Sequence, residues 1–124
     1  LKSIMWGIKQ PKGNVHMYFG DPITDEEIEA ASECDKNDRY QKIRHTMDRR
    51  IIGGYKLWAT NYMAYDMLNN TDKYASHYQP KDMEAFQGYI AHQLMQVEPT
   101  LDHQQLKEIL LQIYSNPVVS KENL

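Results

Sequence analysis

One short extended segment near the start of this chain, set among helical sequence, limits the folds open to it. Val15, Met17 and Phe19 alternate with His16 and Tyr18, which is the period-two pattern of a half-buried strand. The turn residues at 20–22 end with a proline and close the strand. A single strand cannot stand alone, because its backbone donors and acceptors need partners. We therefore expect residues 15–19 either to pair with residues 1–9 or to belong to a sheet outside this chain.

Helical signals dominate the sequence after this segment. Thr24 and Glu27 form a capping box and predict a short helix that ends near Ser32. The polar stretch before Pro80 is expected to be a loop. Apolar residues at helical spacing predict three further helices, over about 38–52, 60–68 and 83–97.

A last helix is predicted to begin after Asp102, with Gln105 completing its capping box. Asn116-Pro117 is expected to end it and to leave a frayed tail after Val119. The short connection at 98–101 predicts that the last two helices pack as an antiparallel pair. The inner face of the last helix is predicted to be Leu106, Ile109, Leu110 and Ile113.

Composition is that of an ordinary folded protein, with 41% hydrophobic and 25% charged residues among 124. Cys34 is the only cysteine, so no internal disulfide can form, which favours a cytoplasmic setting. No apolar run approaches the ~18 residues of a transmembrane helix. The five histidines include no pair four residues apart, and neither a metal nor a cofactor is expected.

Charge is segregated along the chain, with an acidic stretch at 20–35 followed by a basic one at 36–56. The basic helix presents Lys42, Arg49 and Arg50, which are candidates to face an anionic membrane surface. The alternative is a solvated face, or ion pairing with the preceding acidic helix. Nucleic-acid binding is not expected, since the acidic stretch would repel phosphates.

Two stretches resemble one enzyme family. Residues 12–23, K-G-N-V-H-M-Y-F-G-D-P-I, are similar to a late-strand pattern, K-G-x-V-x-V-x-F-G-x-P-I, of the glycerol-phosphate and lysophospholipid acyltransferases. Residues 54–66, G-Y-K-L-W-A-T-N-Y-M-A-Y-D, look like a segment near the C-terminus of bacterial members, with Ala59 in place of a proline. The resemblance covers roughly residues 10–70 and includes none of the family's catalytic motifs.

This resemblance implies a fold and an activity. The fold would be mainly α (α+β): a strand or hairpin from an incomplete α/β acyltransferase core, followed by four or five helices. The parent enzyme would transfer an acyl group from coenzyme A or acyl carrier protein to a lysophospholipid or related acceptor. It would be cytoplasmic or peripheral on the inner face of the cell membrane. The divisions expected are a core strand (1–23), a helical segment (24–70) and a helical hairpin (80–119).

Candidate substrate-binding residues lie in the second stretch. Lys56, Asn61 and Tyr62 stand among aromatic residues that could line an acyl groove, or could simply be packed between helices. The family uses a histidine and an aspartate five residues apart as its catalytic base. That spacing occurs at His16–Asp21 and at His77–Asp82, but we expect neither pair to be catalytic, because the surrounding motif is missing.

A rival interpretation is a non-catalytic helical module that binds a protein partner or a second copy of itself. The amphipathic period of the last two helices supports it, and a homo-oligomer stays open. The chain begins at Leu1 without a methionine, and the acyltransferase interpretation expects the catalytic residues in a preceding part of a longer protein.

Overall fold

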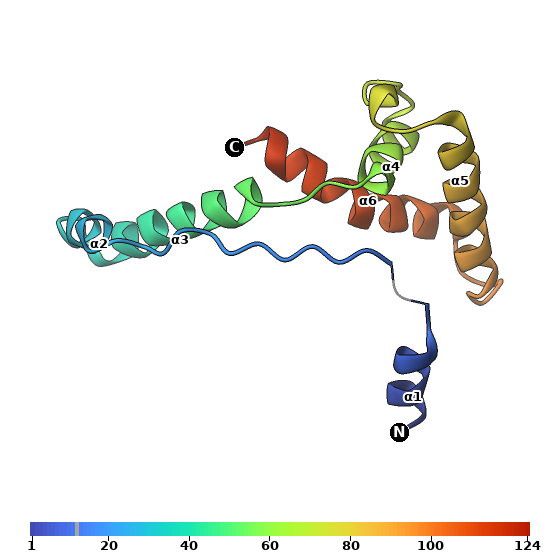
Figure 1. Ribbon diagram of the computed structural model, residues 1–124, viewed down its shortest axis with the longest axis horizontal. Coiled ribbons are helices and arrows are strands. Elements are labelled where there is room, and N and C mark those ends of the chain that lie inside the picture. Colours follow the sequence, from blue (N-terminus) through green and yellow to red (C-terminus); the bar gives the residue numbers. More distant parts are fainter. Residues whose placement is uncertain (12) are drawn as a thin grey trace.

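The computed structural model describes residues 1–11 and 13–124, and every regular element within them is a helix. Helices α4, α5 and α6 gather at one end of the molecule, α2 and α3 form a projecting arm, and α1 lies apart (Figure 1). The predicted mainly helical class is confirmed. In chain order the elements are α1 (Lys2–Lys9), α2 (Asp25–Ser32), α3 (Lys36–Gly53), α4 (Ala59–Asn69), the 3-10 helix η1 (Ala75–His77), α5 (Pro80–Met95) and α6 (His103–Glu122).

Two predicted helix starts are confirmed by their capping bonds. The Thr24 hydroxyl accepts from the Glu27 amide at 3.2 Å, and the Glu27 carboxylate accepts from the Thr24 amide at 2.9 Å. At α6, one carboxylate oxygen of Asp102 accepts from the amides of Gln104 and Gln105 at 3.0 and 3.1 Å. Gln105 thus contributes its backbone to this cap. These bonds satisfy amides that have no partner within their own helices.

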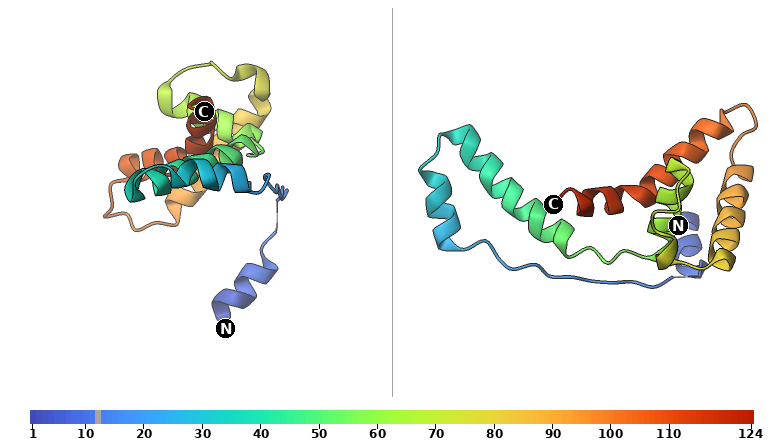
Figure 2. Two further views of the ribbon diagram at one scale, coloured as in Figure 1. Left: turned by 90° about the vertical axis from the view of Figure 1, so that its left-hand side faces the viewer. Right: turned by 90° about the horizontal axis from the view of Figure 1, so that it is seen from above.

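The hydrophobic core lies between α4, α5 and α6. Its fully buried members are Met63, Ala64, Phe86, Ile90 and Leu111. Helix α6 packs against α4 far more extensively than against α5, and α5 and α6 diverge from their connecting loop (Figure 2). The two helices predicted as an antiparallel pair therefore touch only in part. Small buried residues on both facing helices, Ala64 and Ser115, let the α4 and α6 backbones approach closely.

The buried face of α6 and its end both differ from the prediction. Of the four residues predicted to face inward, Leu106 and Leu110 are half-buried and Leu110 packs against the core. Ile109 and Ile113 are 46% and 64% exposed instead, while Leu111 and Val118 are buried. Helix α6 also continues through Pro117 to Glu122 instead of ending there. Proline removes one hydrogen-bond donor from the helix interior. The residues after it compensate, because Val118 is buried and the last turn of α6 contacts the loop that follows α4. The expected frayed tail is therefore helical.

Residues 1–9 do not form the second strand of a hairpin. They form α1, whose apolar residues at positions 1, 4, 5 and 8 follow a helical rather than an alternating period. Residues 13–24, the extended segment, pass the C-terminal end of α3 and form no strand ladder in the described structure (Figure 1). Val15, Met17 and Phe19 are 86%, 73% and 84% exposed. The predicted half-buried strand is thus extended in shape but unpaired and uncovered.

The molecule exposes much more surface than a compact protein of its size. Its accessible surface is 9816 Å² for 14.6 kDa, whereas a compact monomer of this mass exposes about 6,900 Å². The excess follows from the arm, the extended segment and α1, because the hydrophobic core is confined to α4, α5 and α6. Helix α3 contributes no buried residue, and Tyr40, Met47 and Ile51 on its apolar stripe are 46–61% exposed.

Candidate functional site

The extended segment is held against the C-terminal end of α3. The Tyr18 ring lies so close to Gly54 that a Cβ at position 54 would overlap it. This close approach explains the second glycine of the Gly53-Gly54 pair. Arg50 fixes the far end of the segment, since its guanidinium donates to the Pro22 carbonyl at 2.9 Å and pairs with the Glu27 carboxylate at 2.6 Å. Residues 13–23 and 54–66, the two stretches that carry the family resemblance, therefore meet.

An open groove of about 390 Å³ lies where these stretches meet. It contains one lysine and one histidine, no carboxylate, and several aromatic rings. Such a lining suits an anionic group attached to an apolar body. The residues that line it are His16, Tyr18, Gly20, Ile51, Gly54, Tyr55, Lys56, Trp58, Asn61 and Pro117.

Two of the three candidate substrate-binding residues line this groove. The Lys56 ammonium lies 5.4 Å from the centroid of the Trp58 ring, a cation–π distance, and forms no ion pair in the described structure. Asn61 is engaged internally, since its carbonyl oxygen accepts from the Trp58 amide at 2.7 Å and its amide donates to the Tyr114 carbonyl at 2.8 Å. Tyr62 lies elsewhere and stacks on His77 with ring centroids 4.0 Å apart. Lys56 is thus the candidate with a free charge.

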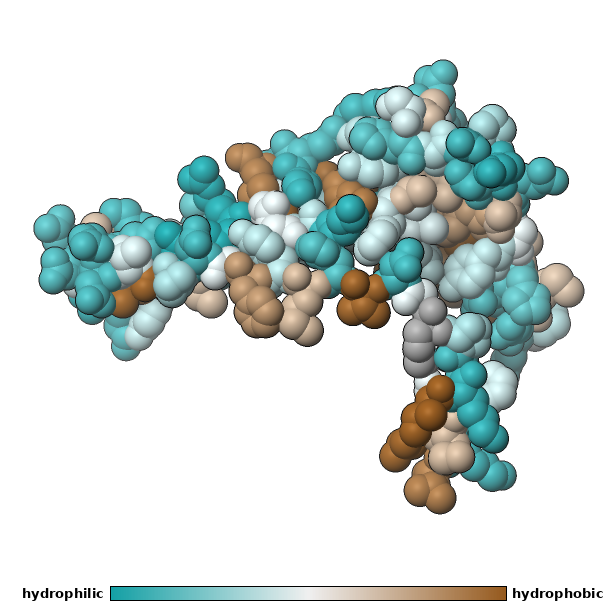
Figure 3. All heavy atoms as spheres, viewed as in Figure 1, coloured by the Kyte–Doolittle hydropathy of each residue, from teal (hydrophilic) through white to brown (hydrophobic). Residues whose placement is uncertain are grey.

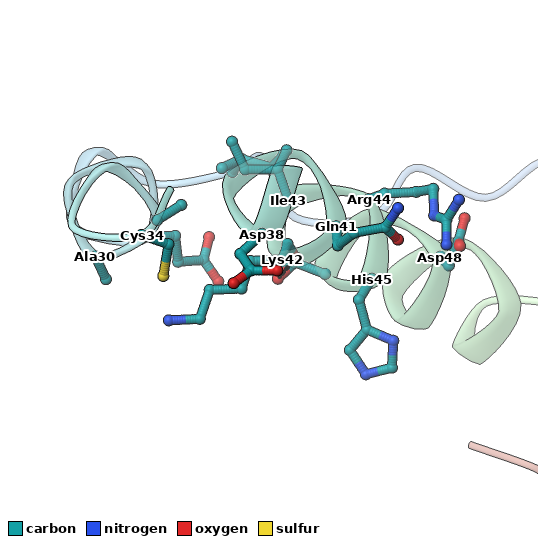
Figure 4. Close-up of a pocket in the computed structure, with 13 residues that line it drawn as sticks. Ala30, Cys34, Asp38, Gln41, Lys42, Ile43, Arg44, His45 and Asp48 are labelled. Atoms are coloured by element: carbon teal, nitrogen blue, oxygen red, sulfur yellow. Dashed lines mark hydrogen bonds between the residues drawn. The ribbon is translucent and has the colours of Figure 1, made fainter. Parts of the chain in front are cut away.

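A second open groove, of about 700 Å³, lies between α2 and α3 and carries charges of both signs (Figure 4). Lys42 extends from α3 along the same side as Cys34 and Asp38, while His45 points away from the helix (Figure 4). Of the three predicted membrane-facing residues, Lys42 and Arg49 are exposed and Arg50 is bound to Glu27. The bond from the Thr24 amide, followed by Arg50, lowers the pKa of Glu27.

Neither histidine–aspartate spacing produces a catalytic pair in the described residues. His16 and Tyr18 both line the groove, and among the described residues no hydrogen bond joins His16 to Asp21. His77 stacks on Tyr62, and the Asp82 carboxylate instead accepts from the Gln79 amide at 2.9 Å to cap α5. No group of three metal-binding side chains occurs in the part of the chain that the structure describes. Among the same residues, no helix combines the length and apolarity needed to span a bilayer.

Sequence reasoning missed a buried carboxylate that organises the loop before α5. Asp66 is 2% exposed on α4, and its oxygens accept from the Thr71 hydroxyl, the Tyr74 amide and the Tyr78 hydroxyl at 2.7–3.0 Å. Burial, together with the bond to Asp66, raises the pKa of Tyr78 to about 12. An acid flanked by apolar residues at 63, 64, 67 and 68 was the available signal. The arrangement is structural, because every Asp66 oxygen is occupied from within the chain.

A second polar cluster ties the same loop to the end of α6. Lys73 pairs with Glu122 at 2.6 Å, and the Tyr74 hydroxyl donates to the same carboxylate. The Lys73 ammonium also lies 5.0 and 5.4 Å from the ring centroids of Tyr74 and Tyr65. Hydrogen bonds from Lys73 and Tyr74 lower the pKa of Glu122. This cluster fixes the last turn of α6, which is why the expected frayed tail is helical.

No protein-family model, curated protein sequence or solved structure matches this chain. The two local resemblances and the geometry of the groove are therefore the observations that bear on function.

Proposed function

We propose that this chain is the C-terminal portion of an acyltransferase that transfers an acyl group from a thioester to a lysophospholipid or related lipid acceptor. Its thioester donor would be carried by coenzyme A or acyl carrier protein. The catalytic histidine and aspartate would lie in a part of that protein outside this chain.

The observation that carries the proposal is the contact between the two resembling stretches. Residues 13–23 and 54–66 are separated by the whole of α2 and α3, yet Tyr18 packs on Gly54 and both stretches line one groove. Two segments that act together in one family are expected to be close in space. In this proposal Lys56 would contact the anionic part of the acceptor or donor.

The exposed side of the extended segment supports the same proposal. Tyr18 faces α3, while Val15, Met17 and Phe19 are left uncovered. The backbone amides of residues 14–19 donate to no group in the described structure. An alternating apolar edge with free backbone donors suits the addition of a strand to a sheet. An α/β acyltransferase core would supply that sheet.

The experiment is a thioester-release assay on two proteins. The chain by itself should release no thiol from palmitoyl coenzyme A in the presence of lysophosphatidic acid. The product of the complete gene should release it. Lys56→Gln in the complete protein should raise KM more than it lowers kcat, because the ammonium binds the substrate and takes no part in the chemistry. Lys107→Gln, on α6, is the matched control.

Two outcomes would contradict the proposal. One is a complete gene without a histidine–aspartate pair at the family's spacing before residue 1. The other is a complete protein that releases no thiol from acyl coenzyme A or from acyl carrier protein. In either case the non-catalytic interaction module becomes the better description, and the uncovered apolar residues of α3 are the observation that favours it.

A further inference from the structure

Helix α1 carries an apolar face that nothing in the described structure covers. Leu1, Ile4, Met5 and Ile8 share one side of the helix, and their side chains are 95%, 63%, 47% and 69% exposed. Helix α1 packs against no other helix of the described chain. Hydrophobic residues gather on one side of it and hydrophilic residues on the other (Figure 3). Trp6, outside this face, is 66% exposed as well.

The charge of this region is opposite to that of the remaining chain. Residues 1–20 contain three lysines and no acidic residue, a formal charge of +3. The other residues contain 14 − 3 = 11 basic and 17 acidic side chains, a formal charge of −6. An anionic surface would therefore attract the N-terminal region and repel the body, which orients the molecule with α1 toward that surface.

We propose that α1, with Leu1 before it, is an interfacial anchor that lies on an anionic lipid surface. A short amphipathic helix with lysines beside its apolar face has the properties of helices that lie in the headgroup region. Exposed tryptophan also suits that depth. The inference deepens the proposed function and rests on it for its purpose, because a lysophospholipid acceptor resides in such a surface.

Charge favours a lipid surface over a second copy of the chain as the occupant. Pairing the α1 faces of two copies would bring two regions of charge +3 together without an acidic residue in either. Anionic headgroups neutralise the same lysines. The structure also favours α1 over α3 as the lipid-binding element, since Arg50 is occupied by Glu27 and the α2–α3 groove carries acidic residues.

The test is sedimentation of the chain with vesicles of phosphatidylcholine, with and without phosphatidylglycerol. The chain should bind the anionic vesicles and lose binding as salt is raised. Lys2→Gln with Lys9→Gln should weaken binding about fivefold for each lysine. Lys42→Gln with Arg49→Gln removes the same charge from α3 and should leave binding within about twofold.

The apolar face has its own matched pair of variants. Ile4→Glu with Ile8→Glu should weaken binding at least about tenfold. Ile109→Glu with Ile113→Glu makes the same change at two exposed isoleucines of α6 and should have at most about a fivefold effect. Because α1 contacts no other helix, the thermal melting of the α1 variant should match that of the unmodified chain, which separates lost binding from lost folding.

Three results would overturn the anchor: no binding to anionic vesicles, equal losses in the α1 and α6 variants, or a dimer in sedimentation equilibrium that Ile4→Glu with Ile8→Glu dissociates. Enzyme activity is a separate measurement. A chain that binds vesicles, from a complete protein without thioester release, would retain the anchor and refute the proposed function. Release without vesicle binding by the chain would refute the anchor alone.

Discussion

The Asp66→Asn substitution should destabilise the fold by about 2–3 kcal/mol. The carboxylate accepts three hydrogen bonds at a site that is 2% exposed. An amide has one acceptor oxygen, so the Thr71 hydroxyl, the Tyr74 amide and the Tyr78 hydroxyl cannot all keep their bonds. Hydrogen bonds to charged groups contribute about 1 kcal/mol more than neutral ones, and three are affected. That is a large part of the 5–15 kcal/mol typical of a domain.

The assay is urea unfolding followed by the helical circular dichroism signal, with the free energy obtained by linear extrapolation. Asp72→Asn is the matched control. It makes the same change six residues later, at an exposed side chain that forms no hydrogen bond in the described structure. Its effect should stay within about 0.5 kcal/mol. An Asp66→Asn protein that unfolds within 0.5 kcal/mol of the unmodified chain, at an unchanged slope, would refute the role given to this carboxylate.

Three other predictions follow from the packing and the charges. Leu111→Ala should cost about 2–5 kcal/mol in urea unfolding and Ile113→Ala less than about 1, and the reverse order would restore the α6 face expected from sequence. Gly54→Ala should speed chymotrypsin cleavage within residues 13–20, because the new methyl displaces the ring that holds the segment; unchanged cleavage would contradict that contact. The hydrogen bond from Lys73 lowers the pKa of Glu122 below 4.5 in the folded chain. The ionised Glu122 therefore stabilises the fold above pH 4.5, and this contribution is lost as the pH falls through the pKa of the folded state. In urea unfolding measured at a series of pH values, Glu122→Gln should reduce this loss of stability at low pH, and Glu84→Gln should leave it unchanged. The same pH dependence in the unmodified chain and in both variants would contradict the stabilising role of the Lys73–Glu122 pair.

Local signals in the sequence predicted the helices after the extended segment well, but not the structure before it. The capping residues Thr24 and Asp102 fixed two helix starts, because a cap needs only neighbours along the chain. The number of helices after the extended segment agrees with the five observed, since each has its own apolar period. Helix α1 was not predicted, although its apolar residues have helical spacing, because a pattern of eight residues is short. The alternation at 15–19 also favoured a strand there, which needed residues 1–9 as a pairing partner.

Contacts between distant elements were not predictable in the same way. Two faces of α6, one that includes Leu106 and one that includes Leu111, both have helical spacing. The face that includes Leu111 is buried because small residues on both helices, Ser115 on α6 and Ala64 on α4, allow close packing there. Pro117 was predicted to end the last helix. The turn beyond it is stabilised by contacts of Glu122 with Lys73 and Tyr74, which lie far away in the sequence and could not be foreseen. The groove was anticipated only in part. Lys56 and Asn61 line the groove, whereas Tyr62 stacks on His77, a contact that the spacing of residues along the sequence does not indicate.

The projecting arm acts geometrically as a lever. Helix α3 has 18 residues and is about 27 Å long, and it meets α6 while its other end carries α2. The five-residue connection at 54–58 is the pivot, held where the Lys121 ammonium donates to the Tyr55 carbonyl at 2.8 Å. A rotation of about 10° there would carry the acidic tip through about 5 Å, given the helix length. Gly54, within the pivot, would scarcely move, so a small change at the groove would become a large displacement at α2.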